Sequence, residues 1–236
     1  MGDTVVGVYL YGSGVTGGLR PQSDIDILVA CTARVTGVLR QRLVHELLAI
    51  SGRNAVHGPS RPLDVTVLAL PDLRPWRFPP VCDLLFGEWL RGELEAGNLA
   101  PAAPRPDLAI AVSTLLQHHH GLAGPAATEV LAPVPPSDLR RAVFDCLPAL
   151  LENLRSDERN VMLTLARMWV TLAKGAIVPK DAAAAWVIAR LPADIAPAPA
   201  LARSAYLGES RDVWDGSERQ VDAFVRHAVA AIDAFR

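Results

Sequence analysis

Two aspartates, two residues apart at the start of an apolar strand, constrain this chain more than any other feature. Asp24 and Asp26 belong to residues 23–30, where polar and apolar residues alternate before an apolar run, as in a strand with one polar face. Residues i and i+2 of a strand point to the same face, so the two carboxylates lie side by side and repel each other unless a cation lies between them. Hard oxygen ligands favour Mg²⁺, which completes its shell with water and the phosphate oxygens of a substrate.

A glycine-serine turn comes before these aspartates. Gly12 and Ser13 follow the apolar, β-rich residues 4–11 and open a loop that contains three more glycines. At the end of a strand, backbone N–H groups and the Ser13 hydroxyl can approach a phosphate closely, because glycine has no Cβ. The alternative is a surface loop followed by two solvated aspartates. The combination of the turn, the paired acids and their apolar surroundings favours the phosphate site.

A third acid, Asp64, lies within the apolar residues 63–70, which also have the composition of a strand. An acid inside such a strand is costly unless it is paired or bound to a metal. If this strand lies beside that of Asp24 and Asp26, three carboxylates converge, as suits two-metal nucleotidyl transfer. Asp64 is then also a candidate general base for an acceptor hydroxyl. The alternative is an edge strand with Asp64 facing water.

Periodicity divides the chain into an α/β part and an all-α part. Apolar residues at helical spacing predict helices at 38–50, 82–95 and 107–119 in the first part. Residues 121–136 are rich in proline, glycine and small residues and are typical of a linker. The helices predicted beyond it cover residues 137–154, 159–174, 180–191, 199–206 and 217–235. We therefore expect one domain over residues 1–133 and a helical domain over residues 134–236.

Composition bounds the class of protein. The 236 residues carry 23 Lys and Arg against 25 Asp and Glu, a net charge of -2 that argues against binding to bulk nucleic-acid phosphate. No apolar run reaches the roughly 20 residues that a membrane span needs, and no signal peptide is recognisable. The three cysteines form no CxxC motif and fit reduced thiols. We expect a cytoplasmic monomer that binds small molecules, with neither nucleic acid nor membrane as a partner.

The motifs carry a family resemblance. The pattern Tyr11-Gly12-Ser13, ten residues, then Asp24-Ile25-Asp26 resembles the polymerase-β-like nucleotidyltransferase superfamily. The blocks YLYGSGVTGGLRPQSDIDILV, FGEWLR, LTLARMW, PKDAAAAW and YLG are similar, in this order, to the aminoglycoside adenylyltransferases that modify spectinomycin and streptomycin. The resemblance covers residues 5–235. Family members usually carry a further helix before the first strand, so here we expect that strand to pack on something else unless more residues precede it.

The resemblance implies a fold and a reaction. The fold class is α+β: a nucleotidyltransferase domain, with a small mixed sheet and helices, followed by an all-α helical bundle. The active site lies in the cleft between them. Two Mg²⁺ ions and ATP as co-substrate serve the transfer of AMP to an antibiotic hydroxyl.

Roles transfer by position to the matching residues. The catalytic and metal-binding carboxylates are Asp24, Asp26 and Asp64, of which Asp64 stands at the base position. The ATP-binding positions are Gly12, Ser13, Ser23, Asp107, Lys180 and Tyr206. The antibiotic-binding positions are Trp89, Asp157 and Asn160, and Glu88 is expected to join them because of its negative charge. Aminoglycosides are polycationic, which suits acidic residues in their pocket, whereas the triphosphate needs a cation such as Lys180.

Several of these residues have plainer alternatives. Trp89 also suits an ordinary core position, and Asp157 also suits the N-cap of the helix predicted after it. Lys180 stands at a helix start, where lysine matches the helix dipole poorly, and this favours a functional role. Tyr206 is equally compatible with a structural role.

Three departures from the family bear on the substrate. Asp64 stands where most members carry the longer Glu, and Asn160 stands where a histidine is expected. Residues 147–156 read LPALLENLRS and contain no tryptophan, which resembles the members that act on spectinomycin alone. We therefore expect the 9-hydroxyl of spectinomycin as acceptor. The alternatives are additional 3''-adenylylation of streptomycin, a nucleotidyltransferase with a different acceptor, and a nucleotide-binding module without catalysis.

Overall fold

A five-stranded mixed sheet organises the first part of the chain in the computed structural model, which describes residues 4–55 and 58–236. Its strands are β1 (Val5–Tyr11), β2 (Ile25–Cys31), β3 (Leu63–Ala69), β5 (Leu84–Phe86) and β7 (His120–Ala123), in the order β5-β3-β2-β1-β7. Only β2 and β3 are parallel; the other neighbours in this sheet are antiparallel. The parallel pair is joined through α1 (Gly37–Ile50), the crossover that parallel strands require.

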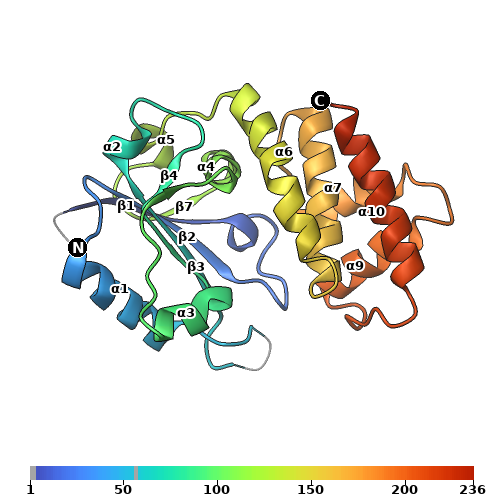
Figure 1. The fold of residues 1–236 in the computed structure, drawn as a ribbon, viewed down its shortest axis with the longest axis horizontal. Coiled ribbons are helices and arrows are strands. Elements are labelled where there is room, and N and C mark those ends of the chain that lie inside the picture. The colour runs from blue at the N-terminus through green and yellow to red at the C-terminus, as the bar shows by residue number, and fades with distance from the viewer. Residues whose placement is uncertain (1–3, 56–57) are drawn as a thin grey trace. The chain divides into compact units, whose positions relative to one another are not determined.

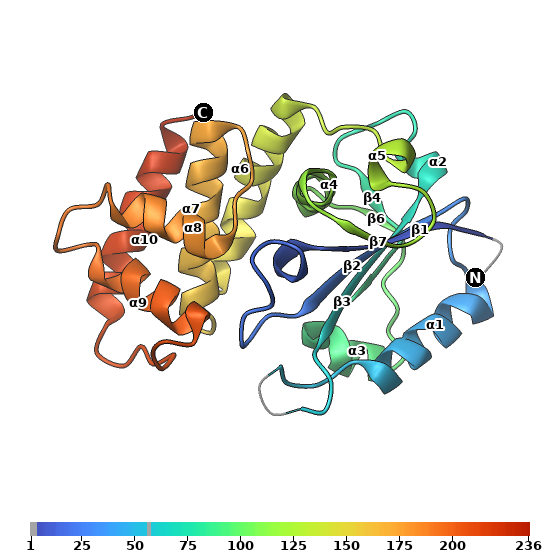
Figure 2. The ribbon, with the colours of Figure 1, turned by 180° about the vertical axis from the view of Figure 1, so that it is seen from behind.

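Helices cover both faces of this sheet (Figures 1 and 2). On one face lie α2 (Leu70–Leu73), α4 (Asp107–Gln117) and α5 (Ala127–Val130), packed against Leu28 and Leu68 of the strands. On the other face lie α1 and α3 (Arg91–Glu95), packed against Val65, Val67 and Phe86. The alternation of strand residues between two cores explains why these segments are almost continuously apolar.

The helix predicted over residues 82–95 is wrong. These residues form β4 (Val81–Cys82), β5, a 3₁₀ turn η3 (Glu88–Leu90) and only then α3, while β4 pairs with β6 (Ala103–Pro104). Leu84 and Phe86 pack in the core beneath β3, and Leu85 between them points to the other face of the sheet. This alternation is the two-residue period of a strand, which the prediction of a helix overlooked. The buried Asp83 accepts the Val35 N–H at 2.7 Å and pairs with Arg40 at 3.3 Å, so it is satisfied without a helix.

The linker predicted over residues 121–136 is also wrong. β7 pairs with β1 and forms one edge of the sheet, and α5 follows it. The Tyr9 hydroxyl donates a hydrogen bond to the Pro125 carbonyl at 3.0 Å, which fastens this segment to β1. A short edge strand tolerates glycine and nearby proline because half of its backbone groups face no neighbouring strand.

The later part of the chain is helical, as predicted. Its helices are α6 (Pro136–Glu152), α7 (Glu158–Lys174), α8 (Lys180–Ile188), α9 (Pro197–Leu207) and α10 (Glu218–Asp233). The helix α7 is buried on most of its sides, with α8, α9 and α10 packed around it. It ends at Gly175, whose φ of 71° is the left-handed conformation expected of a glycine stop.

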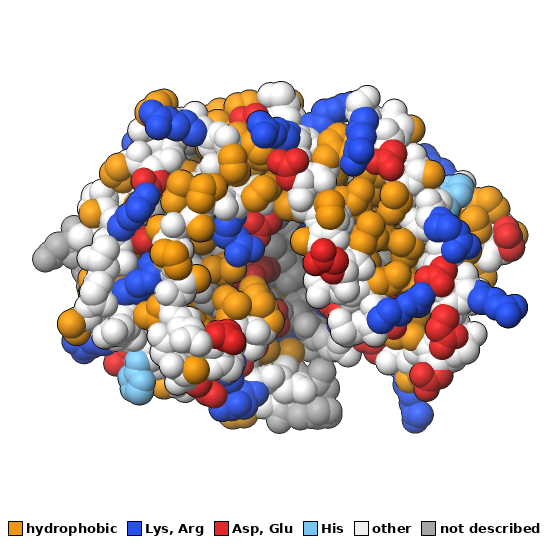
Figure 3. Space-filling model, in the orientation of Figure 1, with side chains coloured by type: hydrophobic (Ala, Val, Ile, Leu, Met, Phe, Trp, Pro, Cys, Tyr) orange, Lys and Arg blue, Asp and Glu red, His pale blue; other side chains and the backbone are white. Residues whose placement is uncertain are grey.

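The chain divides into two compact units, Met1–Ala142 and Val143–Arg236, and the division falls within α6. The domain boundary expected between residues 133 and 134 stays a prediction. None of the helices in the described parts of the chain is long and apolar enough to cross a membrane. On the face shown in Figure 3, basic and acidic side chains are interspersed over each unit, in keeping with the net charge of -2.

Phe86 tests the corrected assignment of β5, because its ring is 0% exposed in the core beneath β3. We expect Phe86→Ala to lower the free energy of unfolding by about 3–5 kcal/mol. The control Leu122→Ala alters a side chain that is 52% exposed on β7, and should cost less than about 0.5 kcal/mol. Urea denaturation measures both; similar costs for the two variants would contradict the buried strand.

Candidate active site

The parallel pairing of β2 and β3 brings two of the predicted carboxylates together. Asp26 and Asp64 are direct partners in this pairing, and Tyr11 is the partner of Asp26 across β1 and β2. Partners in a sheet point to the same face, so the two carboxylates and the phenol are neighbours. Asp24 immediately precedes β2, two residues before Asp26. The expected neighbouring of the two strands is therefore confirmed and it pairs Asp26 with Asp64, whereas the joint use of all three carboxylates and the roles of these residues stay predictions.

Asp64 occupies an unfavourable position for a lone carboxylate. Burial, together with the negative charges of Asp26, Asp24 and Asp107, raises its pKa to about 8, and the charge of Arg105 opposes the shift. Among the described residues, Asp64 Oδ1 is the one buried side-chain oxygen or nitrogen without a hydrogen-bond partner. The strand β3 lies between β2 and β5, so the alternative of a solvated edge strand is wrong. A buried acid of this kind calls for a cation or a proton.

The donor set fits Mg²⁺ that arrives with a phosphate ligand. Within residues 4–55 and 58–236, no three or more His, Cys, Asp or Glu side chains are grouped so that they could hold a metal ion by themselves. Mg²⁺ does not require this, because it commonly binds one or two carboxylates and completes its octahedron with water and substrate phosphates. The unpartnered Oδ1 of Asp64 and the adjacent carboxylate of Asp26 supply such oxygens.

Gly12 is fitted to the carboxylate of Asp26. Its φ of 65° lies in the left-handed region, and a Cβ built on it would lie 2.1 Å from Asp26 Oδ2. Only glycine can therefore take this position without moving the carboxylate. The Gly12 carbonyl accepts the Thr16 hydroxyl at 2.8 Å and the Thr16 N–H at 3.2 Å, which closes the turn. Ser13 is the next residue, in the 3₁₀ turn η2 (Gly12–Gly14) at the end of β1.

Ser23 and Arg61 hold the loop that leads into β2. The buried Ser23 Oγ accepts the Arg20 N–H at 3.2 Å. Arg61 Nη1 donates to the carbonyl oxygens of Arg20 and Ser23, at 2.9 and 3.0 Å. Sequence reasoning missed Arg61, because its partners are backbone atoms about forty residues away and no motif marks it.

Tyr11 is a second residue that sequence reasoning missed. Its buried phenol has a pKa well above the usual value, mainly because of burial and then because of the charges of Asp26 and Asp64. A side-chain hydrogen bond with Thr66, on the neighbouring β3, partly offsets the shift. Tyr11 therefore remains a neutral phenol and forms a wall of the carboxylate site. The signal was present, since Tyr11 stands two residues before Ser13 on the predicted strand.

Asp107 lies near the same carboxylates. It is the first residue of α4, and its Oδ2 is 2.6 Å from Arg105 Nη2. Its negative charge raises the pKa of both Asp64 and Tyr11. The structure thus brings Asp107 to the neighbourhood of the carboxylate site, paired with a basic residue that the sequence did not indicate.

Trp89 lies on the surface of the first unit. Its side chain is 60% exposed, so the alternative of an ordinary core residue is wrong. The indole ring folds back over Gly87, where a Cβ would come within 2.4 Å of a ring carbon. An exposed aromatic face held against a glycine backbone is suited to packing against a ligand.

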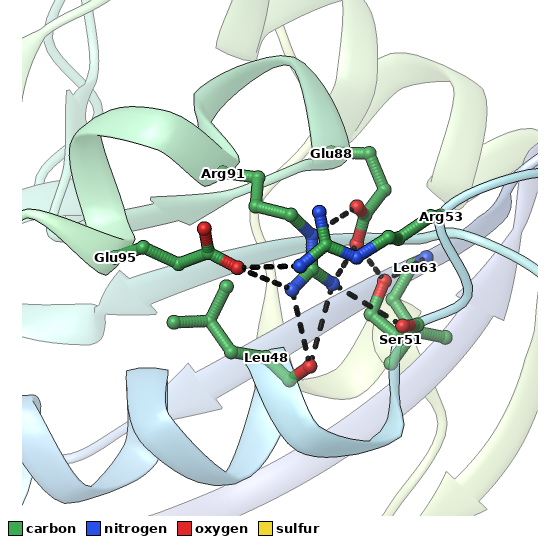
Figure 4. A network of polar contacts seen from close by, with 7 residues as sticks. All are labelled: Leu48, Ser51, Arg53, Leu63, Glu88, Arg91 and Glu95. Atoms are coloured by element: carbon green, nitrogen blue, oxygen red, sulfur yellow. Dashed lines mark hydrogen bonds and ion pairs between the residues drawn. The ribbon is translucent and has the colours of Figure 1, made fainter.

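Glu88 is already engaged by its own unit (Figure 4). Its Oε2 lies 2.5 Å from Arg91 Nε and its Oε1 lies 2.8 Å from Arg91 Nη2, while the Ser51 hydroxyl donates to Oε1. Burial raises the pKa of Glu88, but the hydrogen bonds from Arg91 and Ser51 and the charges of Arg91 and Arg53 bring it below its usual value. The carboxylate is therefore ionised and its charge is balanced, which differs from the open acid expected for an antibiotic site.

The predicted site residues of the second unit lie at one end of its helices. Asp157 is the N-cap residue of α7 but makes no capping hydrogen bond with its side chain, so the simple capping alternative fails. Lys180, the first residue of α8, donates from Nζ to Asn160 Oδ1 in the first turn of α7. Arg203 Nε donates to the Asp181 carbonyl at 3.2 Å, which places the later part of α9, with Tyr206, beside the start of α8.

The raised pKa of Asp64 predicts a pH-dependent penalty in protein without metal. The pKa of Asp64 is about 8 in the folded protein and 3.8 is its ordinary value. The contribution of this group to the free energy of unfolding is therefore fully present below pH 4 and is lost as the pH rises through 8. Asparagine cannot ionise, so Asp64→Asn should melt at a higher temperature than wild type in EDTA at pH 8. The difference should grow between pH 5 and 8 in calorimetry.

Asp83→Asn is the matched control, because Asp83 is a buried carboxylate that is paired, and this variant leaves the half-buried Arg40 without its ion-pair partner. It should melt below wild type. A melting difference between Asp64→Asn and wild type that stays constant or shrinks with rising pH would contradict the raised pKa.

Both parts of the chain match known families. Residues 2–54 match the family described as Nucleotidyltransferase domain, and residues 129–231 match Aminoglycoside adenylyltransferase, C-terminal domain. The chain is 42% identical over 232 residues to the Spectinomycin 9-adenylyltransferase of Staphylococcus aureus, covering 98% of this chain and 89% of the relative. It is 41% identical over 231 residues to the Aminoglycoside (3'') (9) adenylyltransferase of Escherichia coli, covering 97% and 88%.

A solved structure agrees with this relationship. The crystal structure of spectinomycin adenyltransferase AAD(9) from Enterococcus faecialis with ATP and spectinomycin superposes with a TM-score of 0.93 at 30% identity. The match covers 98% of this chain and 92% of that one. The mixed sheet with helices and the helical part that follows are the fold expected from the resemblance. The chain therefore belongs to the aminoglycoside adenylyltransferase family of nucleotidyltransferases.

Proposed function

We propose that this protein transfers AMP from ATP, with Mg²⁺, to a hydroxyl of an aminoglycoside-type antibiotic, namely the 9-hydroxyl of spectinomycin. The observation that carries the proposal is the pairing of Asp26 and Asp64, with one unpartnered buried oxygen on Asp64, beside the Gly12 turn. Acids that repel each other at close range need a cation or a proton, and nucleotidyl transfer brings a metal-bound phosphate to such a site. The names of the relatives support the acceptor class.

The first unit supplies the phosphate end of the site. Asp24, Asp26 and Asp64 would hold two Mg²⁺ ions, which when bound would stabilise negative charge on the reacting phosphates. The turn of Gly12 and Ser13 contacts the triphosphate through backbone N–H groups and the Ser13 hydroxyl. Ser23 keeps the loop between this turn and Asp24 in place, and in our proposal it also contacts phosphate.

Asp64 acts as the general base. It accepts the proton of the acceptor hydroxyl, whose oxygen attacks the α-phosphorus in line while pyrophosphate leaves. The raised pKa of Asp64 belongs to the protein without metal; Mg²⁺ bound beside it would lower this pKa, so that the carboxylate is ionised and able to accept the proton. The side chain is one methylene shorter than Glu, so the acceptor must approach β3 more closely than it would with the longer residue.

Residues further from the carboxylates bind the two substrates. Asp107, Lys180 and Tyr206 serve ATP, with the Lys180 ammonium directed to the triphosphate. Trp89 packs against the antibiotic, and Asp157 and Asn160 bind its polar groups. Asp157 has the best electrostatic match, because its carboxylate is not used as a helix cap and aminoglycosides are cationic. We further propose that the protein acts as a cytoplasmic monomer.

Spectinomycin is favoured over streptomycin by the segment that leads to α7. Residues 147–156, which cover the end of α6 and the turn after it, contain no tryptophan and no aspartate. A large aromatic side chain and a further acid are the groups that would hold a longer, more cationic antibiotic. Streptomycin 3''-adenylylation is the second acceptor reaction that the assay below measures.

An acceptor panel tests the proposal. Pyrophosphate release from ATP and Mg²⁺ is measured with spectinomycin, with streptomycin and without acceptor, and the modified hydroxyl is located by NMR. We expect release with spectinomycin and substitution at its 9-hydroxyl. Asp64→Asn should abolish release, and full activity of this variant would overturn the base assignment. No release with either antibiotic would overturn the acceptor class.

Gly12→Ala tests the approach of the turn to Asp26. Its Cβ would lie 2.1 Å from Asp26 Oδ2, so the carboxylate must move. We expect kcat for spectinomycin to fall by roughly a hundredfold, as for a misplaced catalytic group. Gly18→Ala is the matched control, since Gly18 has a φ of 87° but nothing within 4 Å of its Cβ position. Equal losses in the two variants would mean that backbone strain alone, and not contact with Asp26, explains the effect.

A further inference from the structure

A network of polar side chains links the end of α1, η3 and α3 to the start of β3 (Figure 4). The helices α1 and α3 cover the face of the sheet that carries Val65 and Val67, which is the face opposite Asp26 and Asp64. The central residue of the network is the buried Ser51, which follows α1. The Ser51 hydroxyl donates its proton to Glu88, and Ser51 Oγ accepts the Leu63 N–H at 3.0 Å. The hydroxyl has a single proton, so the two bonds have fixed directions: Leu63 donates to Ser51, and Ser51 donates to Glu88.

Arg91 fixes the other end of this network. The buried guanidinium contacts both carboxylate oxygens of Glu88, Glu95 Oε1 at 3.1 Å and the Ser51 carbonyl at 3.2 Å. It also donates to the Leu48 carbonyl in the last turn of α1, at 3.3 Å. An ion pair with this many partners restricts the position of Glu88 far more than a surface pair does.

The network ends on the immediate neighbours of two proposed site residues. Glu88 precedes Trp89 in η3, and Leu63 precedes Asp64 at the start of β3. Leu63 packs into the core beneath α1, which turns the next residue, Asp64, to the opposite face of the sheet. Movement of Glu88 or of the Leu63 N–H is therefore passed directly to Trp89 or to Asp64.

We propose that Ser51, Glu88 and Arg91 are positioning residues that hold the antibiotic-binding Trp89 and the catalytic Asp64 in a fixed relation. This proposal rests on the proposed function and assigns Glu88 to the support of the site in place of direct contact with the antibiotic. The charge of Glu88 is needed for Arg91, and its Oε1 is needed for Ser51. A cationic antibiotic would have to compete with both.

Ser51→Ala tests the proposal, because it removes the hydroxyl that joins the Leu63 N–H to Glu88 and leaves the chemical identity of both groups unchanged. We expect roughly a tenfold loss in kcat and a similar rise in the KM for spectinomycin, with the KM for ATP changed less than about twofold. Thr171→Ala is the matched control. Its buried hydroxyl donates to the Arg167 carbonyl within α7, far along the chain from this network, and its loss should leave both parameters unchanged.

A double-mutant cycle with Trp89→Ala separates positioning from general loosening. If Ser51 acts on the antibiotic through Trp89, Ser51→Ala should no longer raise the KM for spectinomycin when the indole is absent. Additive effects on this KM would overturn the proposed route through Trp89. Glu88→Gln adds a variant of the same volume: it should lower kcat as well as raise the KM, whereas a rise in KM alone would indicate direct contact with the antibiotic.

Deuterium uptake tests the positioning role of Ser51 independently of the proposed function, because it requires no catalytic activity. In Ser51→Ala, amides in peptides that contain residues 63–66 and 87–90 should exchange faster than in wild type, whether or not any antibiotic is modified. Faster exchange together with an inactive wild type would overturn the proposed function and support the anchoring. Wild-type exchange and wild-type kinetics in Ser51→Ala would overturn the network's role.

Discussion

The repulsion between Asp26 and Asp64 is the constraint on which the rest of the first unit depends. Parallel pairing of β2 and β3 places these carboxylates side by side, and burial leaves one Asp64 oxygen without a partner. Such an arrangement destabilises the folded protein unless a cation or a proton binds to the carboxylates. Gly12, whose missing Cβ makes room for Asp26, and Arg61, which fastens the preceding loop, both serve to maintain it.

The strands and their acids were predictable because their pattern is local. An apolar strand interrupted by an acid is costly in any fold, so Asp24, Asp26 and Asp64 indicated a cation site before their neighbours were known. The helices of the second unit were predictable for a similar reason, since α7 and α10 repeat apolar residues at helical spacing and α7 stops at Gly175. What remained conditional was the pairing of β2 with β3, because strand order depends on contacts that are distant in the sequence.

The errors arose where tertiary contacts override local pattern. Residues 82–95 have apolar residues at helical spacing, yet Leu84 and Phe86 belong to β5, which pairs with β3. Without β5, the backbone groups of β3 on this side would have no neighbouring strand. The glycine- and proline-rich residues after 120 become an edge strand for the same reason, at the other side of the sheet. The expectation that Glu88 contacts the antibiotic rests on its charge and stays a prediction, but the structure shows that Arg91 and Ser51 already bind its carboxylate. No sequence pattern reveals such partners, since Ser51 and Glu88 are 37 residues apart.

The two faces of the sheet therefore differ in how well the polar groups on them are hydrogen-bonded. One face carries Asp26 beside Tyr11 and Asp64, whose pKa values are both raised, and one oxygen of the buried Asp64 has no hydrogen-bond partner. The opposite face carries Ser51, Glu88 and Arg91, which are buried or half-buried and hydrogen-bonded to one another. Because neighbouring residues of a strand alternate between the faces, Asp64 is one peptide unit from Leu63, whose N–H donates to Ser51 on the opposite face. The contacts on the opposite face can thus hold Asp64 in place without using any group that we propose to contact a substrate.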